Sequence, residues 1–341
     1  MMNKGILCVG TITVDYAKKI NRLPVLEELV IIDEVTFSNG GPGLNIAFDL
    51  RQLDSSLEVE AIGCVGNDSN GQYIIDRTSE IGIINSRMQR SPGSMTCFTD
   101  AMTLNSNGRR TFFHHPGSNN DLDLDAIDLT MTKPRILHVG APGIHRKADD
   151  HAGGKDSQWV KILKRARELG IETNMEMVHL DAELEKELVL PCLPYLSSII
   201  VNESEAGSLV DLPAKVDGAD AKVDWVHLEK IVKEIIKKGV SKLAVIHSPA
   251  GAVAADASGA TWRQGSVKVP TNEIKGTTGA GDAFASGVVY GLHEGWGVQE
   301  CLKLGVATAA QNIKSFATAQ DIKPFAQTLA EADNYGYRSV N

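Results

Sequence analysis

The sequence predicts an α/β fold with a mostly parallel central sheet and a small second sheet. Short apolar segments typical of buried strands alternate with amphipathic segments typical of helices over most of the chain. Strands that alternate with helices of about 10 to 15 residues favour βαβ units, and therefore a parallel sheet. Two stretches, 11–37 and 94–115, are instead extended and amphipathic. They suit a small sheet set against the main domain.

The spacing of apolar residues predicts the strands and helices of the main domain. The strand-like segments are, in chain order, 5–10, 59–65, 135–140, 172–177, 197–202, 242–247, 252–256 and one near 266–270. Apolar residues at helical spacing predict helices from Asn45 onward, over 71–81, around 159–170, and over 225–238, 280–293 and 298–314. The polar segment 213–224 between two of these elements is predicted to be a surface loop.

The two extended stretches carry strand and turn signals. Residues 29–37 mix β-branched and charged side chains, as an exposed strand does. Residues 94–104 and 109–115 alternate in polarity and flank Asn107-Gly108. This pattern is typical of a β-hairpin with a tight turn.

Composition and charge exclude several classes of protein. The chain has 341 residues, 43% of them apolar, with 34 basic and 43 acidic residues and a net charge of −9. This charge does not favour a dedicated nucleic-acid binder. The five cysteines are scattered and never spaced C-x-x-C, and the apolar runs are too short to span a membrane. We therefore expect reduced thiols, no membrane partner and a cytoplasmic location.

The most informative segment is KGTTGAGDAF at 275–284, between a predicted strand and a predicted helix. Gly276, Gly279 and Gly281 allow positive φ angles and a close approach of the backbone to a ligand. Free N–H groups at the start of the next helix would form an anion site. A phosphate-binding P-loop has Lys after its last glycine, whereas this chain has Asp282.

Asp282 has two interpretations. A carboxylate beside an anion site could act as a general base on an incoming hydroxyl while backbone amides hold a phosphoryl group. Alternatively, Asp282 could cap the helix that follows the glycine turn.

Two further segments carry weaker signals. SNGGPGLNIA at 38–47 has Ile46 where a dinucleotide fingerprint needs a third glycine, so it is better explained as a hinge before a helix, with Asn45 as a ligand-binding residue or a helix cap. NESE, from Asn202 to Glu205, follows an apolar strand. It could orient a hydrated Mg²⁺ or form a helix capping box.

Together these segments resemble the PfkB (ribokinase-like) family of carbohydrate and nucleoside kinases. Two signatures carry the resemblance: GGPGLNIAFDLRQL from Gly40 with GCVGNDSNG at 63–71, and GTTGAGDAFASGVVYGL from Gly276. The match extends from about residue 5 to about residue 325. It implies a ribokinase-like three-layer sandwich with a small β-sheet lid, and an ATP- and Mg²⁺-dependent transfer of phosphate to a hydroxymethyl group.

The resemblance also implies a role for each matching residue. On the reacting side, Asp282 matches the catalytic base, and the anion hole matches Gly279, Ala280 and Gly281. On the acceptor side, Asp15 and Asn45 match residues that bind sugar hydroxyls, and Gly40-Gly41 matches the hinge of the lid. On the nucleotide side, the matching or candidate residues are Asn202, Glu205, Ser248, Gly251 and Thr278, with Glu205 nearest the metal.

The same resemblance organises the chain. We expect one kinase domain over 1–330, with lid segments 11–37 and 94–115 inserted, and a tail over 331–341. Such lids often mediate homodimers in the family. The second signature begins with Gly276, where the family usually has an Asp that helps hold a monovalent cation, so potassium activation stays open. Gly140 and Ala141 stand where a ribose site often has an acid.

Two other functions compete with the kinase. A sugar-sensing protein on the same fold would not need Asp282, and a Rossmann dehydrogenase is excluded by Ile46 and by the order of elements. The acceptor stays open among a ketohexose, a ketodeoxy sugar acid and a nucleoside. The 18 aromatic residues, few of them near the expected site, disfavour a pocket that stacks a nucleobase.

Overall fold

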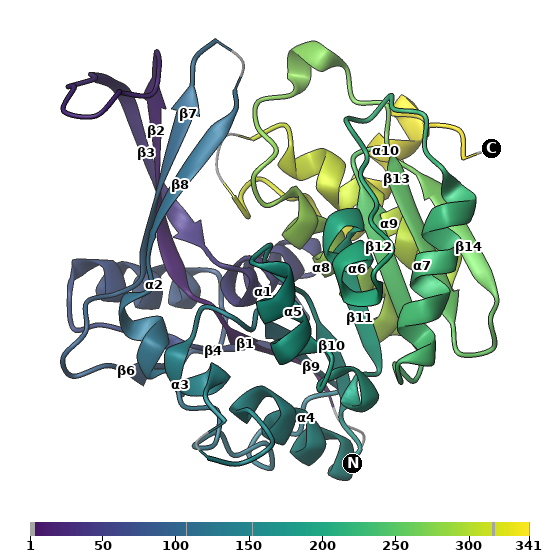
Figure 1. Cartoon of the computed structure of the whole chain (residues 1–341), viewed down its shortest axis with the longest axis horizontal. Helices are drawn as coiled ribbons and strands as arrows, with labels where there is room; N and C mark the ends of the chain where they lie inside the picture. The colour runs from purple at the N-terminus through teal and green to yellow at the C-terminus, as the bar shows by residue number, and fades with distance from the viewer. Residues whose placement is uncertain (1–3, 107, 152, 316–317, 341) are drawn as a thin grey trace.

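The computed structural model describes residues 4–106, 108–151, 153–315 and 318–340. An eight-stranded sheet forms its centre (Figure 1), in the order β14-β13-β12-β11-β10-β9-β1-β4. Its strands are β1 (Ile6–Gly10), β4 (Val59–Ile62), β9 (Ile136–Gly140), β10 (Glu172–Met175), β11 (Ser198–Asn202), β12 (Leu243–Ser248), β13 (Gly251–Asp256) and β14 (Thr261–Gly265). The strands from β4 to β12 pair in parallel, and β13 and β14 are antiparallel. The mostly parallel sheet is therefore confirmed.

Helices cover both faces of the sheet, as the alternation of strand residues requires. Ile6 and Cys8 of β1 point into one apolar core, and Leu7 and Val9 point into the other. The first core is closed by α1 (Pro42–Leu53), α2 (Ser69–Glu80), α8 (Ala280–Glu294), α9 (Val298–Asn312) and α10 (Phe325–Tyr335). The second is closed by α4 (Gln158–Glu168), α5 (Ala182–Val189), α6 (Glu203–Val210) and α7 (Trp225–Lys237). The result is the three-layer sandwich that the sequence led us to expect.

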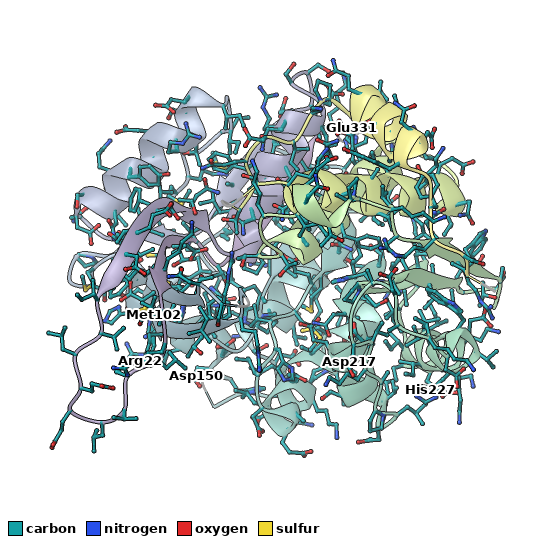
Figure 2. The ribbon with its side chains drawn as sticks, turned by 90° about the horizontal axis from the view of Figure 1, so that it is seen from above. Arg22, Met102, Asp150, Asp217, His227 and Glu331 are labelled. Carbon is teal, nitrogen blue, oxygen red and sulfur yellow. The ribbon has the colours of Figure 1, made fainter. Side chains whose placement is uncertain are left out.

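The small sheet stands away from the sandwich (Figure 1) and has the order β3-β2-β7-β8. Its strands are β2 (Thr13–Ile20), β3 (Ile32–Gly40), β7 (Phe98–Leu104) and β8 (Arg110–His115). In the view from above, Arg22 and Met102 mark this sheet and its loop at the edge of the molecule (Figure 2). The predicted hairpin is present as β7 and β8. Asn107 of its expected turn lies outside the described residues.

Several elements differ from the expectations. No strand of the main sheet covers 266–270 among the described residues; β14 ends at Gly265, and Val267 makes only an isolated bridge to Tyr337. The chain leaves the sheet there because the segment around Arg338 packs directly on Gly265. Helix α10 extends through residue 330, where we expected the tail to begin.

The remaining elements are short. β5 (Cys64–Val65) and β6 (Gln89–Arg90) pair beside the sandwich, so the strand expected over 59–65 is divided in two. A one-turn helix, α3 (Arg146–Asp149), follows β9. Three 3₁₀ turns lie at Gly117–Asp121, Leu193–Tyr195 and Thr271–Glu273. Of the helices in the described ranges, none is both long and apolar enough to cross a membrane.

Candidate active site

The glycine turn before α8 has the geometry that the sequence indicated. Gly279 has a φ of +76°, and a side chain there would press on Thr318 and Asn312 at 3.1–3.4 Å. Only glycine fits this turn without strain. Helix α8 then begins at Ala280, so the N–H groups of its first turn have no acceptor within the helix. Free N–H groups at a helix start are a feature that binds anions, and Gly279, Ala280 and Gly281 stand at this helix start.

Asp282 is not a helix cap. The N-cap position of α8 is Gly279, and no side chain caps it. The Asp282 carboxylate instead accepts a hydrogen bond from Nδ2 of Asn45 through Oδ2 at 2.6 Å. Burial raises the pKa of Asp282, although the Asn45 hydrogen bond and His138 oppose this effect. The capping interpretation is therefore wrong.

Asn45 is not a helix cap either. Helix α1 begins at Pro42 after Gly41, whose φ is +89°, so Asn45 lies on the first turn inside the helix. Its Oδ1 accepts from Nδ2 of Asn39 at 3.3 Å, which leaves its own Nδ2 directed at Asp282. Asn45 is buried, so this bridge between α1 and α8 is shielded from solvent.

Asp15 lies against the end of β3. A side chain on Gly40 would come within 2.1 Å of its carboxylate, so the close approach needs glycine at that position. Burial and the nearby charge of Asp282 raise the pKa of Asp15 to about 7, and Thr99 and Arg110 oppose this effect. The acceptor-side residues Asp15, Gly40, Gly41 and Asn45 therefore gather around Asp282, and two carboxyl groups share one side of the site.

A cavity of about 720 Å³ adjoins this group on the other side of α8. Asn202 and Ser248, which we predicted on the nucleotide side, line it, as do Ala280 and Gly281 of the predicted anion hole. Its apolar wall consists of Val267, Val269, Phe284, Val306, Ala309, Ala310 and Ile313. The cavity therefore combines an apolar wall with polar groups at the start of α8 and at the end of β11.

Gly251 and Thr278 lie beside the cavity and do not line it. Gly251 has a φ of +148° and a carbonyl that accepts from Oγ of Ser248 at 3.1 Å, so it shapes the turn between β12 and β13. The carbonyl of Thr278 accepts from Nδ2 of Asn312 at 2.8 Å.

Asn202 and Glu205 form a capping box at the start of α6. The side-chain oxygen of Asn202 accepts from the Glu205 N–H, and Oε2 of Glu205 accepts from the Asn202 N–H, both at 2.9 Å. The capping interpretation is confirmed. Burial raises the pKa of Glu205 to about 8, against the effect of the Asn202 hydrogen bond. Within the described ranges, no three His, Cys, Asp or Glu side chains are grouped to hold a metal ion by themselves.

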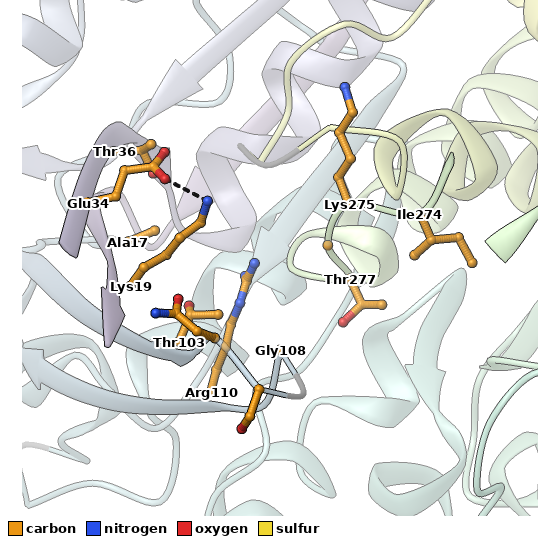
Figure 3. A pocket seen from close by; sticks show the side chains of 13 residues that line it. Ala17, Lys19, Glu34, Thr36, Thr103, Gly108, Arg110, Ile274, Lys275 and Thr277 are labelled. Carbon is orange, nitrogen blue, oxygen red and sulfur yellow. Dashed lines mark hydrogen bonds and ion pairs between the residues drawn. The ribbon is translucent and has the colours of Figure 1, made fainter. Parts of the chain in front are cut away.

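Sequence reasoning missed Arg110. This side chain rises from β8 into a cleft of about 450 Å³ between the lid and the loop 274–277 (Figure 3). Its guanidinium lies 3.0 Å from the place where a side chain on Gly276 would begin, and it has no hydrogen-bonding or ion-paired side chain among the described residues. Burial lowers its pKa, and Asp15 opposes that effect. In the sequence, Arg110 could be recognised only as a basic residue in a predicted hairpin.

His247 and Asn312 were also missed. His247 lies under the anion site, with its ring 3.1 Å from the place of a side chain on Gly281, and burial lowers its pKa to about 4. Asn312, at the end of α9, holds the Thr278 carbonyl and so braces the glycine turn. No pattern in the sequence marks either residue, because each acts through a contact between distant segments.

Solved structures of other proteins share this fold. The solved structure of Arabidopsis thaliana ribokinase complexed with ribose and ATP superposes with a TM-score of 0.78 at 19% identity, covering 97% of this chain and 99% of that one. A ribokinase from Thermotoga maritima superposes with a TM-score of 0.77 at 19% identity, covering 97% and 99%. These structures establish the ribokinase fold.

Sequence relatives extend over the same length. Guanosine-inosine kinase of Exiguobacterium acetylicum is 27% identical, covering 92% of this chain and 95% of its own. Ribokinase of Lactococcus lactis is 25% identical, covering 95% of both chains. The family profile described as pfkB family carbohydrate kinase matches residues 3–324. Because this profile spans nearly the whole chain, the chain belongs to the pfkB family of carbohydrate kinases, phosphotransferases with an alcohol group as acceptor.

Proposed function

We propose that this kinase transfers the γ-phosphoryl group of ATP to a hydroxymethyl group of a sugar or sugar-like substrate, with Asp282 as the general base. The observation that carries the proposal is the position of Asp282. Its carboxylate lies on the first turn of α8, accepts a hydrogen bond from Asn45 and, together with burial, raises the pKa of Asp15, and the residue directly follows Gly281, which lines the cavity. A base is needed where the acceptor hydroxyl meets the phosphoryl group.

In this mechanism the acceptor lies under the lid, with hydroxyl groups held by Asp15 and Asn45. Asp282 accepts the proton of the reacting hydroxyl as its oxygen attacks the γ-phosphorus, and the bond to the bridging oxygen of ADP breaks. The N–H groups of Gly279, Ala280 and Gly281 hold the transferring phosphoryl oxygens. Arg110 adds a positive charge from the lid side, which supports the transfer because negative charge concentrates there.

The residues around the phosphate end fit Mg²⁺ held through water. Asn202 lines the cavity and Glu205 lies directly behind it, and their amide and carboxylate oxygens suit a hard cation. When bound, Mg²⁺ would neutralise phosphate charge. Asn202 and Glu205 would orient its water ligands, and the capping box would keep both side chains in place.

Turnover with a panel of acceptors tests the proposal. We expect the purified protein to consume ATP with Mg²⁺ when given one member of a panel of hexoses, ketoses, sugar acids and nucleosides, each assayed with and without K⁺. The product should carry the phosphate on a primary alcohol, as phosphorus NMR would show. Tight binding of one member without turnover would contradict the proposal and favour a sugar sensor.

The Asp282→Asn substitution tests whether Asp282 accepts the proton or only supports the structure. The amide keeps the size of the side chain, but it cannot accept the proton, so kcat should fall by roughly 10²–10⁴-fold. The KM for ATP should stay the same or decrease, because a negative charge near the phosphates is lost. Steady-state kinetics measures both values. Thermal unfolding of the variant provides the control for folding, and a folded variant with a near-normal kcat would remove Asp282 as the base.

The Glu205→Gln substitution tests the metal side. Glutamine can still accept the Asn202 N–H and preserve the capping box, but it cannot lose a proton to become the carboxylate that would order water around a bound Mg²⁺. We expect the Mg²⁺ concentration for half-maximal activity to rise, with the acceptor KM unchanged. Glu183→Gln, at an exposed position of α5, is the matched control. Identical Mg²⁺ titrations for Glu205→Gln and the native protein would exclude Glu205 from the site.

The lid is proposed to move and to join two copies of the chain. Gly40-Gly41, where β3 meets α1, would act as the hinge, and closure would exclude water that otherwise competes as acceptor. The loop and strand before the hinge expose a row of apolar side chains: Val25, Leu26, Leu29, Ile31 and Val35 are between 54% and 93% exposed. An exposed apolar row of this kind on a lid suits a contact with a second lid.

Sedimentation and small-angle scattering test both lid proposals. The native chain should sediment as a dimer, and the double substitution Leu26→Asp with Leu29→Asp should give a monomer, because buried charges oppose the contact. Val226→Asp, at an exposed position of α7, is the control and should remain dimeric. The radius of gyration should shrink when the acceptor binds. A monomeric native protein would exclude the lid dimer, and an unchanged scattering curve would exclude closure.

A further inference from the structure

Three buried polar groups behind Asp282 have no role in the proposed mechanism. They are Asp49 on α1, His138 on β9 and Glu176 directly after β10, and none is more than 5% exposed. Among the described residues, both carboxylate oxygens of Asp49, Nε2 of His138 and Oε1 of Glu176 lack a hydrogen-bond partner. Buried polar groups without partners are rare in native proteins, so each needs an explanation.

The hydrogen bonds around His138 determine which of its nitrogens carries a proton. Nδ2 of Asn174 donates to Oγ of Ser198 at 2.8 Å, so Oδ1 of Asn174 faces Nδ1 of His138, also at 2.8 Å. An amide oxygen can only accept, and therefore Nδ1 of His138 is the donor. In the neutral ring Nε2 is then an acceptor, and it lies 3.4 Å from Oε1 of Glu176. A proton must lie between these two atoms, because otherwise two acceptors would face each other.

Burial decides where that proton lies. It lowers the pKa of His138 to about 4 and raises the pKa of Glu176 well above its usual range. The neutral pair, a carboxylic acid and an imidazole, avoids two buried charges. Glu176 would therefore donate to His138, which donates to Asn174, which donates to Ser198. This chain of hydrogen bonds crosses three neighbouring strands, β9, β10 and β11.

The surroundings of Glu176 also favour the acid form. Besides burial, the charge of Asp282 on α8 raises the pKa of Glu176, and Glu176 in turn raises the pKa of Asp49 on α1, Glu205 on α6 and Cys8 on β1. Three of these four groups are carboxyl groups, the fourth is a thiol, and His138 on β9 is the other titratable neighbour. No lysine or arginine of the described chain is ion-paired to Asp49 or Glu176, and His138 is the one basic neighbour of Glu176 among these residues. Ionisation of Glu176 would therefore add a second negative charge beside the base.

We propose that Glu176 works in its protonated form as a positioning residue for Asp282, donating a hydrogen bond to Nε2 of His138 and adding no second negative charge beside Asp282. This inference rests on the proposed role of Asp282 as the base. Glu176 and His138 also lie 3.0 Å and 3.2 Å from the place of a side chain on Gly140, next to Pro42 at the start of α1. A movement of Glu176 and His138 would therefore shift the start of α1, the helix that carries Asn45.

The Glu176→Gln substitution tests the proposal by activity. Glutamine keeps the donor to Nε2 and cannot ionise, so kcat at neutral pH should stay within about threefold of the native value. On the alkaline side the native kcat/KM should fall as Glu176 loses its proton, and the fall should move upward by about one pH unit or more in the variant. Glu176→Met removes the donor and should lower kcat further. A loss in Glu176→Gln as large as that in Asp282→Asn would overturn the proposal, as would an unchanged alkaline limb.

Thermal unfolding at several pH values tests the protonated acid without relying on activity. A carboxyl group whose pKa is raised in the folded state costs no stability below its unfolded pKa, and the cost grows as pH rises toward the folded pKa. The gain in melting temperature of Glu176→Gln over the native chain should therefore be larger at about pH 8 than at about pH 5. Glu172→Gln is the control on the same strand; its ion pair to Lys242 at 2.7 Å should give no such gain.

The two measurements separate this proposal from the proposed function. A gain that does not grow with pH would overturn the protonated acid, even if Asp282→Asn abolishes turnover. Failure of the proposed function would instead appear as normal turnover in Asp282→Asn, and the unfolding result for Glu176→Gln would be unaffected.

Discussion

The hydrogen bond from Asn45 to Asp282 joins two helices whose sequence positions are 237 residues apart, and the active site depends on it. It exists because α1 and α8 both begin at glycines with positive φ, Gly41 and Gly279, which let each helix start beside the other. The bond holds the carboxylate at the first turn of α8, where the free N–H groups lie. A side chain on either glycine would displace a helix start and separate Asp282 from Asn45.

Several carboxyl groups lie around this hydrogen bond, and the repulsion between their negative charges needs compensation. Besides burial, the charge of Asp282 raises the pKa of Asp15, and Asp49 and Glu176 lie deeper in the same region. Four ionised carboxyl groups in one interior would repel each other strongly, so protons must remain on some of them. Arg110 approaches from the lid, which connects the charge balance of the site to the position of the lid. A kinase that brings a polyanionic nucleotide to this region benefits from having few permanent negative charges there.

The nucleotide side shows how structural and functional roles coincide. The capping box of Asn202 and Glu205 stabilises the start of α6, and the same geometry directs Asn202 into the cavity. Similarly, Asn312 satisfies the Thr278 carbonyl and braces the turn that carries the anion site. A cap and a ligand are therefore not exclusive interpretations for a residue at the carboxyl end of a parallel strand, because this is where helices begin and where α/β proteins bind ligands.

The sequence by itself determined the fold class and most of the residues gathered in the site. The alternation of strands and helices predicted the parallel sheet, since periodicity reports directly which faces are buried. The glycine turns and Asp282 were recognisable because tight turns restrict the residues that can form them. Only the tertiary structure decided that Asp282 and Asn45 are partners and not caps, since both possibilities use the same residue types. It also revealed Arg110, Asn312 and the acids behind Asp282, because contacts between distant segments leave no local pattern in a chain. The strand expected at 266–270 was wrong for the same reason: the packing of residue 338 on Gly265 decides where the sheet ends.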